Sequence, residues 1–545
     1  MKKFILLCTF CWGMLVPGAR ACTSFLAGRN ATIDGSTFIT YAADSHTLYG
    51  ALKFIPAARH PKNSTMEIRE WDTNKLLGHI PQVEYTYKVV GNMNEHQLSI
   101  TESTWGGRPE LVDTTGIIDY GSLMYIALQR AKTAREAITV MTDLVSEYGY
   151  YSSGESFSIA DPEEVWIMEM IGKGPQNQGA VWVAVRIPDD CIAAHANQSR
   201  IHKFPLDDKE NCLYSLDVIS FAREQGYFNG LNKDFSFADA YAPADFGALR
   251  GCEARVWSFY NRFNSSMGKY LSYLNGKSKE YLPLYIKPDK KLSVQDMKDA
   301  MRDHFEGTPF DMTQDVGAGP FKCPYRFRPM TFKVDSVEYT NERAVATQQT
   351  AFTLVAQMRS WLPNAIGGVL WFGVDDTNTC VYVPLYACLN EVPECYSELN
   401  GSMYDLSWTS AFWIHNWVAN MSYSRYDQMI EDIRPVQKDI ETTFYVQQPV
   451  IEKVANDLYR NDPVAAIRFL NAYSVAQAQQ TTVQWKKLGE FLLVKYLDGN
   501  RKKEKGGHFL ENGYGLPADP DFPGYSEEYY RAVAKDAGDR LKVAF

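Results

Sequence analysis

Cysteine is sparse in this chain, and it is not arranged in the patterns that hold metals or staple small folds. Eight of the ten cysteines follow residue 21, and they are widely scattered. These eight include no C-x-x-C pair, and the chain has no H-E-x-x-H motif, so a zinc site has little support. One or two disulfides stay open as an alternative. We therefore expect no metal and no cofactor.

Positive charge is also in deficit, because 55 Lys and Arg stand against 65 Asp and Glu and leave a net charge of -10. That balance argues against nucleic acid and against an anionic membrane surface as partners. Internal repeats and low-complexity segments are absent, and a hydrophobic fraction of 45% is that of an ordinary globular protein. The length suffices for one large catalytic domain with an accessory region.

Long apolar runs are absent except at the N-terminus. There Lys2 and Lys3 precede the apolar residues 4–16, which are too few to span a bilayer, and "ARA" at residues 19–21 fits the small-x-small cleavage pattern. We therefore predict a signal peptide over residues 1–21 that signal peptidase removes. The protein is expected to be exported, periplasmic or secreted, and bacterial.

Directly after this segment the sequence predicts a β-hairpin. Residues 23–27 and 37–41 have strand character, and turn residues that include a "DG" pair lie between them. A hairpin that closes there brings its two open ends together. Cys22 and Asp44 are therefore expected to share one site.

Strands and helices are expected to alternate up to about residue 395, with helices at residues 123–129 and 133–147. Beyond about residue 402 the pattern is mainly helical, and Pro435 and Pro449 punctuate it. Further strands are expected at residues 85–90, 97–101, 157–160, 165–170, 181–186 and 191–194. The predicted organisation is a catalytic domain at residues 22–400, a helical C-terminal region at 401–500 and a polar tail at 501–545.

Cleavage after Ala21 would make Cys22 the first residue of the mature chain, with both a thiol and a free α-amine. The reference pKa of an α-amine is about 7.7 to 8.0, so part of it is neutral near neutral pH and can accept the thiol proton. The thiolate can attack an amide carbonyl, the protonated amine can donate to the leaving nitrogen, and water can hydrolyse the thioester. Cys22 is therefore a candidate nucleophile that needs no histidine.

Two other interpretations of Cys22 stay open. It could be the acylated cysteine of a non-catalytic surface lipoprotein, although Ala19 and Arg20 fit a lipobox poorly. It could also be a buried, inert cysteine of a first strand, which would leave its position next to the cleavage motif unexplained.

Several segments occur in an order and spacing that are specific together. They are "ACTSFLAGRNATIDGSTFITYAADS", "NMNEHQLSITEST", "AKTAREAI", "SFSIADPEEVWIMEM", "AAHANQSRI", "RDHFEGTPFD", and "ERAVATQQTAF" followed by "GGVLWFGVDD". Through them most of the mature chain resembles the dipeptidase A type of cysteine peptidase, within the N-terminal-nucleophile hydrolases and related to penicillin acylases and bile salt hydrolases. The resemblance implies an α+β fold, a four-layer αββα sandwich with two stacked antiparallel sheets between helices.

The resemblance also implies roles for individual residues. Cys22 matches the nucleophile and Asp44 the aspartate that orients its amine. Asn94, in "NMNEHQL", matches an oxyanion-hole asparagine, and Asn197, in "HANQS", matches a second asparagine near the nucleophile. Arg255, in "CEARVW", matches a late active-site arginine. Neutral amides suit an oxyanion because they donate N–H without adding a competing base.

Where the superfamily often has an arginine three residues before the aspartate, this chain has Tyr41, so that guanidinium is lost or supplied elsewhere. Glu102 is the candidate for binding the ammonium of a substrate. The expected function is hydrolysis of dipeptides after export, with small peptides as partners and a homo-oligomer left open. The alternative enzyme uses the same machinery on N-acyl amides such as bile salts, β-lactams or acylated amino acids.

Overall fold

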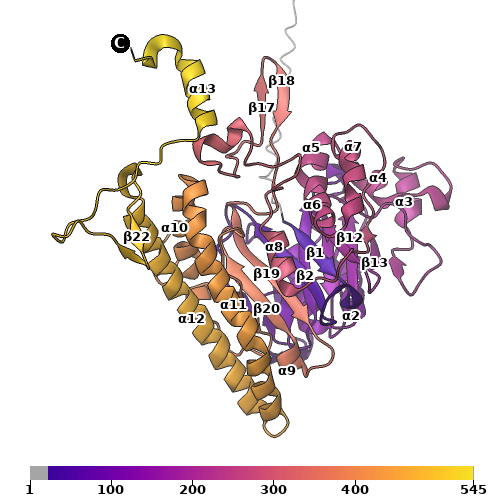
Figure 1. Cartoon of the computed structure of the whole chain (residues 1–545). Helices are drawn as coiled ribbons and strands as arrows, with labels where there is room; N and C mark the ends of the chain where they lie inside the picture. The colour runs from indigo at the N-terminus through magenta and orange to yellow at the C-terminus, as the bar shows by residue number, and fades with distance from the viewer. Residues whose placement is uncertain (1–21, 544–545) are drawn as a thin grey trace, which may run out of the picture.

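The computed structural model describes residues 22–543, so the predicted signal peptide lies outside the described residues. The chain is α+β, with antiparallel sheets flanked by helices (Figure 1). The predicted hairpin is confirmed: β1 (Ser24–Ala27) and β2 (Thr37–Asp44) pair in antiparallel fashion. Its open ends are joined by backbone hydrogen bonds between Thr23 and Ala42, one of which measures 3.0 Å.

The hairpin is the centre of a seven-stranded sheet. β14 pairs with β1 on one side and β19 pairs with β2 on the other, and both hairpin strands are buried along their whole length. The strand order is β16 (Tyr285–Ile286), β14 (Ile192–His195), β1, β2, β19 (Thr350–Met358), β20 (Val369–Val374) and β21 (Val383–Tyr386).

A second sheet of eight strands packs against the first, with β10 and β11 in contact with β2. Two short strands, β7 (Tyr85–Thr86) and β8, replace the single strand expected at residues 85–90, and of these two β8 belongs to this sheet. The order is β15 (Cys212–Tyr214), β13 (Ala180–Arg186), β12 (Val165–Gly172), β11 (Gly154–Ala160), β10 (Ser99–Trp105), β9 (Met93–Asn94), β8 (Val89–Val90) and β3 (Phe54–Ile55).

Strand β1 shows why the hairpin is buried on both faces. Phe25 stacks on Phe259 of helix α6 (Ala254–Phe263), with ring centroids 4.1 Å apart. Ser24 points to the opposite face, and its hydroxyl lies 3.3 Å from that of Thr101 in the eight-stranded sheet. Alternate residues of one strand therefore contact a helix and a second sheet.

Helices α1 (Tyr120–Arg130) and α2 (Ala134–Tyr148) pack on the eight-stranded sheet and form a second apolar core with it. Side chains cap both N-termini, Asp119 for α1 and Thr133 for α2. Gly149 follows α2 with a φ of 74°, a conformation that favours glycine, so the predicted end of this helix is confirmed.

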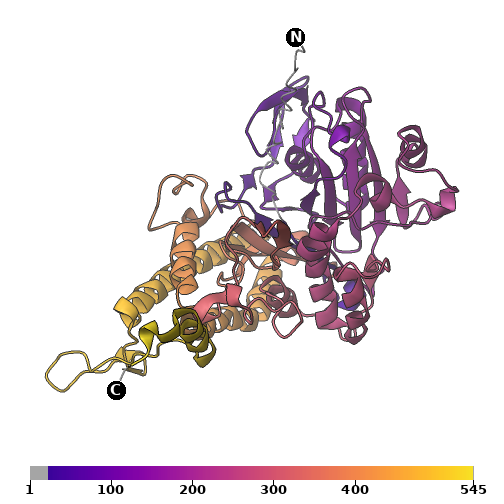
Figure 2. The ribbon, with the colours of Figure 1, turned by 90° about the horizontal axis from the view of Figure 1, so that it is seen from above.

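The helical C-terminal region consists of α10 (Ala411–Tyr423), α11 (Tyr426–Tyr459) and α12 (Pro463–Lys495), which pack on the side of β20 and β21. Figures 1 and 2 show these helices side by side, away from the eight-stranded sheet. Asp462 accepts a hydrogen bond from the Ala465 amide, as expected of an N-cap. Whether these residues form a separate unit stays a prediction.

The expectation that Pro435 and Pro449 interrupt the helices is wrong, because both lie inside the 34-residue helix α11. Each proline is on the exposed face, and so are Glu431 and Tyr445, the residues four positions earlier. The carbonyl that loses its intrahelical partner therefore faces solvent, where water can satisfy it.

Buried ion pairs hold α11 against the catalytic sheets. Arg302, which follows helix α8 (Val294–Met301), lies 2.6 Å from Glu441, and both side chains are at most 8% exposed. Arg359, next to β19, binds Glu452 through both carboxylate oxygens at 2.7 Å. These ion pairs join the helical region to the sheets, and breaking either one would leave a buried charge without its partner, at a large cost in free energy.

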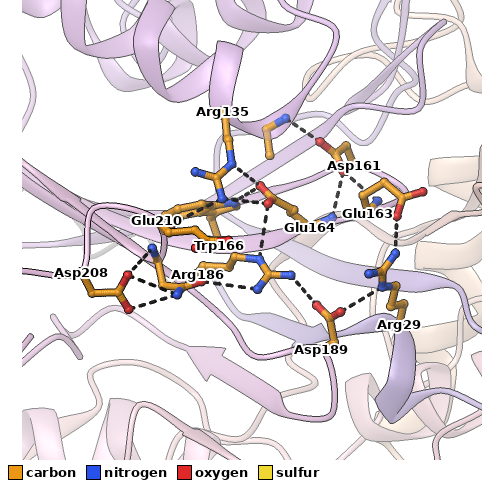
Figure 3. Close-up of polar contacts among 12 residues, drawn as sticks. Arg29, Arg135, Asp161, Glu163, Glu164, Trp166, Arg186, Asp189, Asp208 and Glu210 are labelled. Carbon is orange, nitrogen blue, oxygen red and sulfur yellow. Dashed lines mark hydrogen bonds and ion pairs between the residues drawn. The ribbon is translucent and has the colours of Figure 1, made fainter. Parts of the chain in front are cut away.

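A network of charged residues ties the two sheets together at one end (Figure 3). Arg29, just after β1, pairs with Glu163 in the β11–β12 turn and with Asp189 at 2.9 Å. Arg186 at the end of β13 also reaches Asp189, at 2.6 Å. The network therefore joins the hairpin of one sheet to two connections of the other.

The remaining elements are short or peripheral, and the long polar tail carries α13 away from the sheets (Figure 1). No helix within residues 22–543 is long and apolar enough to cross a membrane. The other helices are α3 (Val218–Glu224), α4 (Phe237–Tyr241), α5 (Phe246–Ala248), α7 (Leu271–Leu274), α9 (Asn364–Gly367) and α13 (Glu527–Ala537). The other strands form four hairpin-like pairs: β4 (Ala58–Arg59) with β7 (Tyr85–Thr86), β5 (Thr65–Arg69) with β6 (Leu76–Pro81), β17 (Thr331–Val334) with β18 (Val337–Thr340), and β22 (Glu504–Lys505) with β23 (His508–Phe509).

Candidate active site

The thiol of Cys22 lies between the two sheets, immediately before β1. Its Sγ atom is 3.4 Å from Oε1 of Glu102 in β10 and 3.8 Å from the hydroxyl of Tyr41 in β2. Cys22 is 5% exposed and Glu102 is 1% exposed. Cys22, the predicted nucleophile, is therefore in contact with Glu102, the predicted ligand of the substrate ammonium.

Tyr41 occupies the position where an arginine was expected from the superfamily pattern. Its hydroxyl donates a hydrogen bond to Oε1 of Glu102, the same oxygen that faces the thiol. Burial raises the pKa of Tyr41 well above its ordinary value, so the phenol keeps its proton as a donor. Tyr41 thus fixes the carboxylate that an arginine at this position would have neutralised.

A second carboxylate, Glu155, lies beside Glu102 and was missed by the sequence analysis. In the register of β10 and β11, Glu155 stands opposite Thr104, two residues along from Glu102. The side chain is fully buried, and neither carboxylate oxygen has a close, well-aligned hydrogen bond to another residue within 22–543. Burial, followed by the charge of Glu102, raises the pKa of Glu155 well above its ordinary value. Burial and the neighbouring charge therefore favour the protonated form of Glu155.

The surroundings of Cys22 keep its thiol protonated. Burial raises the pKa of Cys22 well above the ordinary value, and the negative charges of Glu102 and Asp44 raise it further. The backbone amide of Asp44 and the Tyr41 hydroxyl act in the opposite direction but are smaller causes. A nucleophilic thiolate at this position therefore needs a base or a cation placed directly beside the sulfur.

Asp44 ends β2, and its carboxylate is held from two sides. Arg343 forms a buried ion pair with Oδ2, and the Thr350 hydroxyl donates to Oδ1 at 2.6 Å. Burial raises the pKa of Asp44, and these two partners oppose the rise. Arg343 was not assigned a role from sequence, although it lies in the quoted segment "ERAVATQQTAF". It supplies near Asp44 the guanidinium that Tyr41 does not.

Arg255 connects the start of the chain to the loop after β14. Its Nη1 donates to the Cys22 carbonyl oxygen at 2.8 Å and to the Thr23 hydroxyl at 2.7 Å, and its Nη2 donates to Oδ1 of Asn197 at 2.9 Å. A π-helical turn (Leu249–Glu253) leads into α6 and presents this side chain. The structure therefore brings Arg255 to the nucleophile, as the resemblance implied.

Asn197 is the second asparagine of the predicted site, and it joins the same cluster. Its Nδ2 donates to the Thr104 carbonyl oxygen at 2.6 Å while its Oδ1 accepts from Arg255. The residue has a φ of 60°, in the left-handed region that asparagine tolerates. Two partners thus fix the plane of its amide near Cys22.

Asn94 is the one predicted site residue that the structure does not bring to this cluster. Both hydrogens of its Nδ2 are used, on the carbonyl oxygens of Leu128 at 2.8 Å and Ala131 at 2.7 Å at the end of α1. Its Oδ1 accepts from the amides of His96 and Leu98. The side chain closes a loop against a helix terminus, so an oxyanion role for Asn94 finds no support in this geometry.

Histidine does not serve the thiol in the described residues. His195 pairs with Ser24 across β1 and β14, but its two ring nitrogens lie 2.6 and 2.7 Å from the hydroxyls of Ser103 and Ser158. Burial lowers the pKa of His195 to about 3, so the ring is neutral. All eight cysteines within residues 22–543 are free thiols, and no cluster of metal-binding side chains is found in that range.

Comparison with known proteins identifies relatives of this chain. The chain is 27% identical over 425 residues to a "Probable dipeptidase" of Latilactobacillus sakei, which covers 74% of this chain and 82% of that protein. It is 26% identical to a "Probable dipeptidase" of Salmonella dublin over 71% of this chain and 85% of that one. It is 23% identical to a "Probable dipeptidase B" of Streptococcus pyogenes serotype M1, over 88% of this chain and 94% of that protein. The profile of Peptidase family C69 matches residues 21–439, and the chain therefore belongs to peptidase family C69.

Proposed function

We propose that this member of peptidase family C69 is an exported cysteine dipeptidase, with Cys22 as its nucleophile. The relatives named as probable dipeptidases support the reaction class. The observation that carries the proposal is the 3.4 Å distance between the Cys22 thiol and the Glu102 carboxylate. A peptidase with an anion this close to its nucleophile selects a substrate whose cationic amine lies next to the scissile bond.

Covalent dimensions make the match specific. In a dipeptide the α-ammonium nitrogen lies two bonds, or about 2.5 Å, from the carbonyl carbon that is attacked. A carbon held about 3 to 3.5 Å from Sγ therefore places that nitrogen within reach of Glu102. A substrate cleaved at an N-acyl amide has an acyl-chain carbon and no ammonium next to the attacked carbonyl. It would leave the buried carboxylate without a cation, and this disfavours the N-acyl amidase alternative.

The first chemical step uses the free α-amine that cleavage between Ala21 and Cys22 would create. The neutral amine takes the thiol proton, and the thiolate attacks the substrate carbonyl carbon. Asp44, held by Arg343 and Thr350, orients the amine, and its charge stabilises the ammonium that forms. Asn197 is the donor best placed for the oxyanion, because Arg255 and Thr104 fix its amide.

The second half of the reaction returns the enzyme to its starting state. The ammonium gives its proton to the leaving nitrogen, the C–N bond breaks, and the first amino acid remains as a thioester on Cys22. Water then loses a proton to the neutral amine and attacks the thioester, and the thiolate is reprotonated as the first amino acid leaves.

The same proposal covers maturation and fold. Signal peptidase would both release the protein and uncover the catalytic amine, so export and activation become one cleavage. The two stacked sheets, with α1 and α2 on one side and the C-terminal helices beside β20 and β21, would form the centre of the four-layer αββα sandwich of N-terminal-nucleophile hydrolases.

A substrate panel tests the proposal on the exported protein. Wild type is expected to hydrolyse free dipeptides and to lose activity when their α-amine is acetylated, and Cys22→Ala is expected to lose turnover altogether. Glu102→Gln should reduce kcat/KM for dipeptides roughly 10- to 100-fold, since a charged hydrogen bond contributes about 1.5 to 3 kcal/mol. Equal activity on acetylated substrates would contradict the role of Glu102. An intact mass with added diacylglycerol would support the lipoprotein alternative instead.

A further inference from the structure

Arg343, which holds Asp44, also lines a small cavity of about 20 Å³ at the base of the β17–β18 hairpin. The hairpin leaves and re-enters the fold at this cavity, because Arg328 and Met330 precede its first strand and Glu342 and Arg343 follow its second. Figure 1 shows the hairpin projecting from the fold near α5. The cavity therefore adjoins the carboxylate that is proposed to orient the catalytic amine.

Three arginines line this cavity, and they differ in how their charges are balanced. Arg326 is buried and paired with Asp315 at 2.6 Å. Arg343 is paired with Asp44. Arg328 is exposed to solvent and makes no hydrogen bond or ion pair with any residue between 22 and 543. Among the three arginines of the cavity wall, Arg328 is therefore the one whose guanidinium has no charged partner in the described residues.

Around Asp44, the positive charges of the nearby arginines outnumber the one negative charge of its carboxylate. Burial lowers the pKa of Arg328, and the nearby charge of Arg343 lowers it further, while Asp44 acts in the opposite direction. Arg255 responds to Arg343 in the same way, since burial and then that charge lower its pKa to about 9. Arg343 therefore contacts Asp44 directly, while Arg255 and Arg328 lie near enough for the charges of Arg343 and Asp44 to affect them.

The thiol itself is in contact with a carboxylate, because Oε1 of Glu102 lies 3.4 Å from Sγ. A ligand that pairs with both this carboxylate and the arginines has a cation at one end and an anion at the other. Burial and like charge make each of these groups costly to leave without a counter-ion.

We propose that Arg328, next to Arg343 in the cavity wall, binds the α-carboxylate of the dipeptide substrate. This inference rests on the proposed function and adds the second half of substrate recognition. The carboxylate carbon of a dipeptide lies three bonds beyond the scissile carbonyl carbon, on the leaving-group side. A guanidinium can hold both carboxylate oxygens through paired N–H groups. Arg328 thereby restricts the enzyme to substrates that end one residue after the cut, which separates a dipeptidase from an aminopeptidase.

The test compares each dipeptide with its C-terminal amide, using the mature full-length protein. Wild type is expected to favour the free acid by roughly 10- to 100-fold in kcat/KM, the range of a hydrogen bond to a charged group. Arg328→Met should lower kcat/KM for the acid to near that for the amide and so remove the preference. Arg328→Lys, which keeps the charge but not the paired donors, should retain part of it. The matched control is Lys333→Met, which removes an exposed charge on the same hairpin that is paired only with Glu338 at 3.6 Å.

The outcomes separate this inference from the proposed function. If wild type cleaves dipeptides and Arg328→Met keeps the wild-type preference for the acid, Arg328 does not bind the carboxylate, although the dipeptidase proposal stands. Loss of preference in Lys333→Met as well would show a general effect of hairpin charge and would also overturn the inference. If wild type cleaves neither the dipeptide nor its amide, the proposed function itself fails.

Discussion

Replacing Arg343 with methionine should disable the proposed amine-orienting carboxylate without touching the nucleophile. The Asp44 side chain has no exposed surface, and the Arg343 side chain is 9% exposed. Removing one partner of such a pair leaves an uncompensated buried charge, which typically costs about 3 to 5 kcal/mol of the free energy of unfolding. The variant should still fold if the wild type has ordinary stability, because Thr350 continues to donate to Asp44.

The pH dependence gives this prediction its sharpest form. The pKa of Asp44 is already raised by burial, and loss of Arg343 raises it further. An acid whose pKa is higher in the folded state binds more protons when folded, so stability falls as pH rises from the unfolded pKa to the folded pKa. The stability deficit of Arg343→Met should therefore be small at acid pH and grow toward alkaline pH.

Activity should change with pH in the opposite direction. Orientation of the amine requires the ionised carboxylate, so kcat of Arg343→Met should be lowest at acid pH, by roughly 10- to 100-fold relative to wild type, and should recover as pH rises. Urea denaturation and steady-state kinetics across the same pH series measure both trends. Arg343→Lys is the control, because it keeps a cation near Asp44. An Arg343→Met enzyme with the wild-type pH profile for both quantities would refute the role assigned to this pair.

Two further predictions concern buried carboxylates. Glu155→Gln imitates the protonated acid. In the wild type the raised pKa of Glu155 makes stability fall as pH rises above the pKa of an unfolded glutamate, and glutamine removes this loss. Denaturation at alkaline pH should therefore show that the variant is more stable than wild type. A variant less stable than wild type at alkaline pH would mean that Glu155 is ionised. Glu441→Gln should lower the free energy of unfolding by about 3 to 5 kcal/mol, because it leaves buried Arg302 with only the half-exposed Asp299 as its counter-ion, and the double variant with Arg302→Met should regain part of the loss. Additive losses in the double variant would show that the two residues are not coupled.

Much of the fold near the nucleophile follows from local sequence pattern. Alternating residues and a turn at "DG" predicted the hairpin, and the bridge between Thr23 and Ala42 confirms that its ends meet. The start of α12 is likewise set by local sequence, because Asp462 caps the helix and Pro463 suits its first turn. Local pattern failed at Pro435 and Pro449, where the exposed side of a long docked helix tolerates the missing N–H groups.

In the candidate site, too, some residues follow from local sequence pattern and others depend on tertiary contacts. Position next to the cleavage motif singled out Cys22, and the hairpin placed Asp44 near it. Asn94 shows the limit of motif matching, since its amide is used to close a loop against the end of α1. A motif specifies residue type and spacing, but it does not specify which carbonyl oxygens fold against an amide.

The sequence by itself singled out the candidate nucleophile, the way in which cleavage could complete it, and the strand pair that carries it. Only the tertiary structure decided that Glu102 faces the thiol, that Glu155 lies buried near Glu102, and that Arg343 holds Asp44. These contacts join segments up to about three hundred residues apart, and they form when the two sheets pack together and the chain after β18 returns to Asp44. Periodicity reports which face of a strand is buried, whereas the partner across that face depends on register and packing that no local pattern encodes.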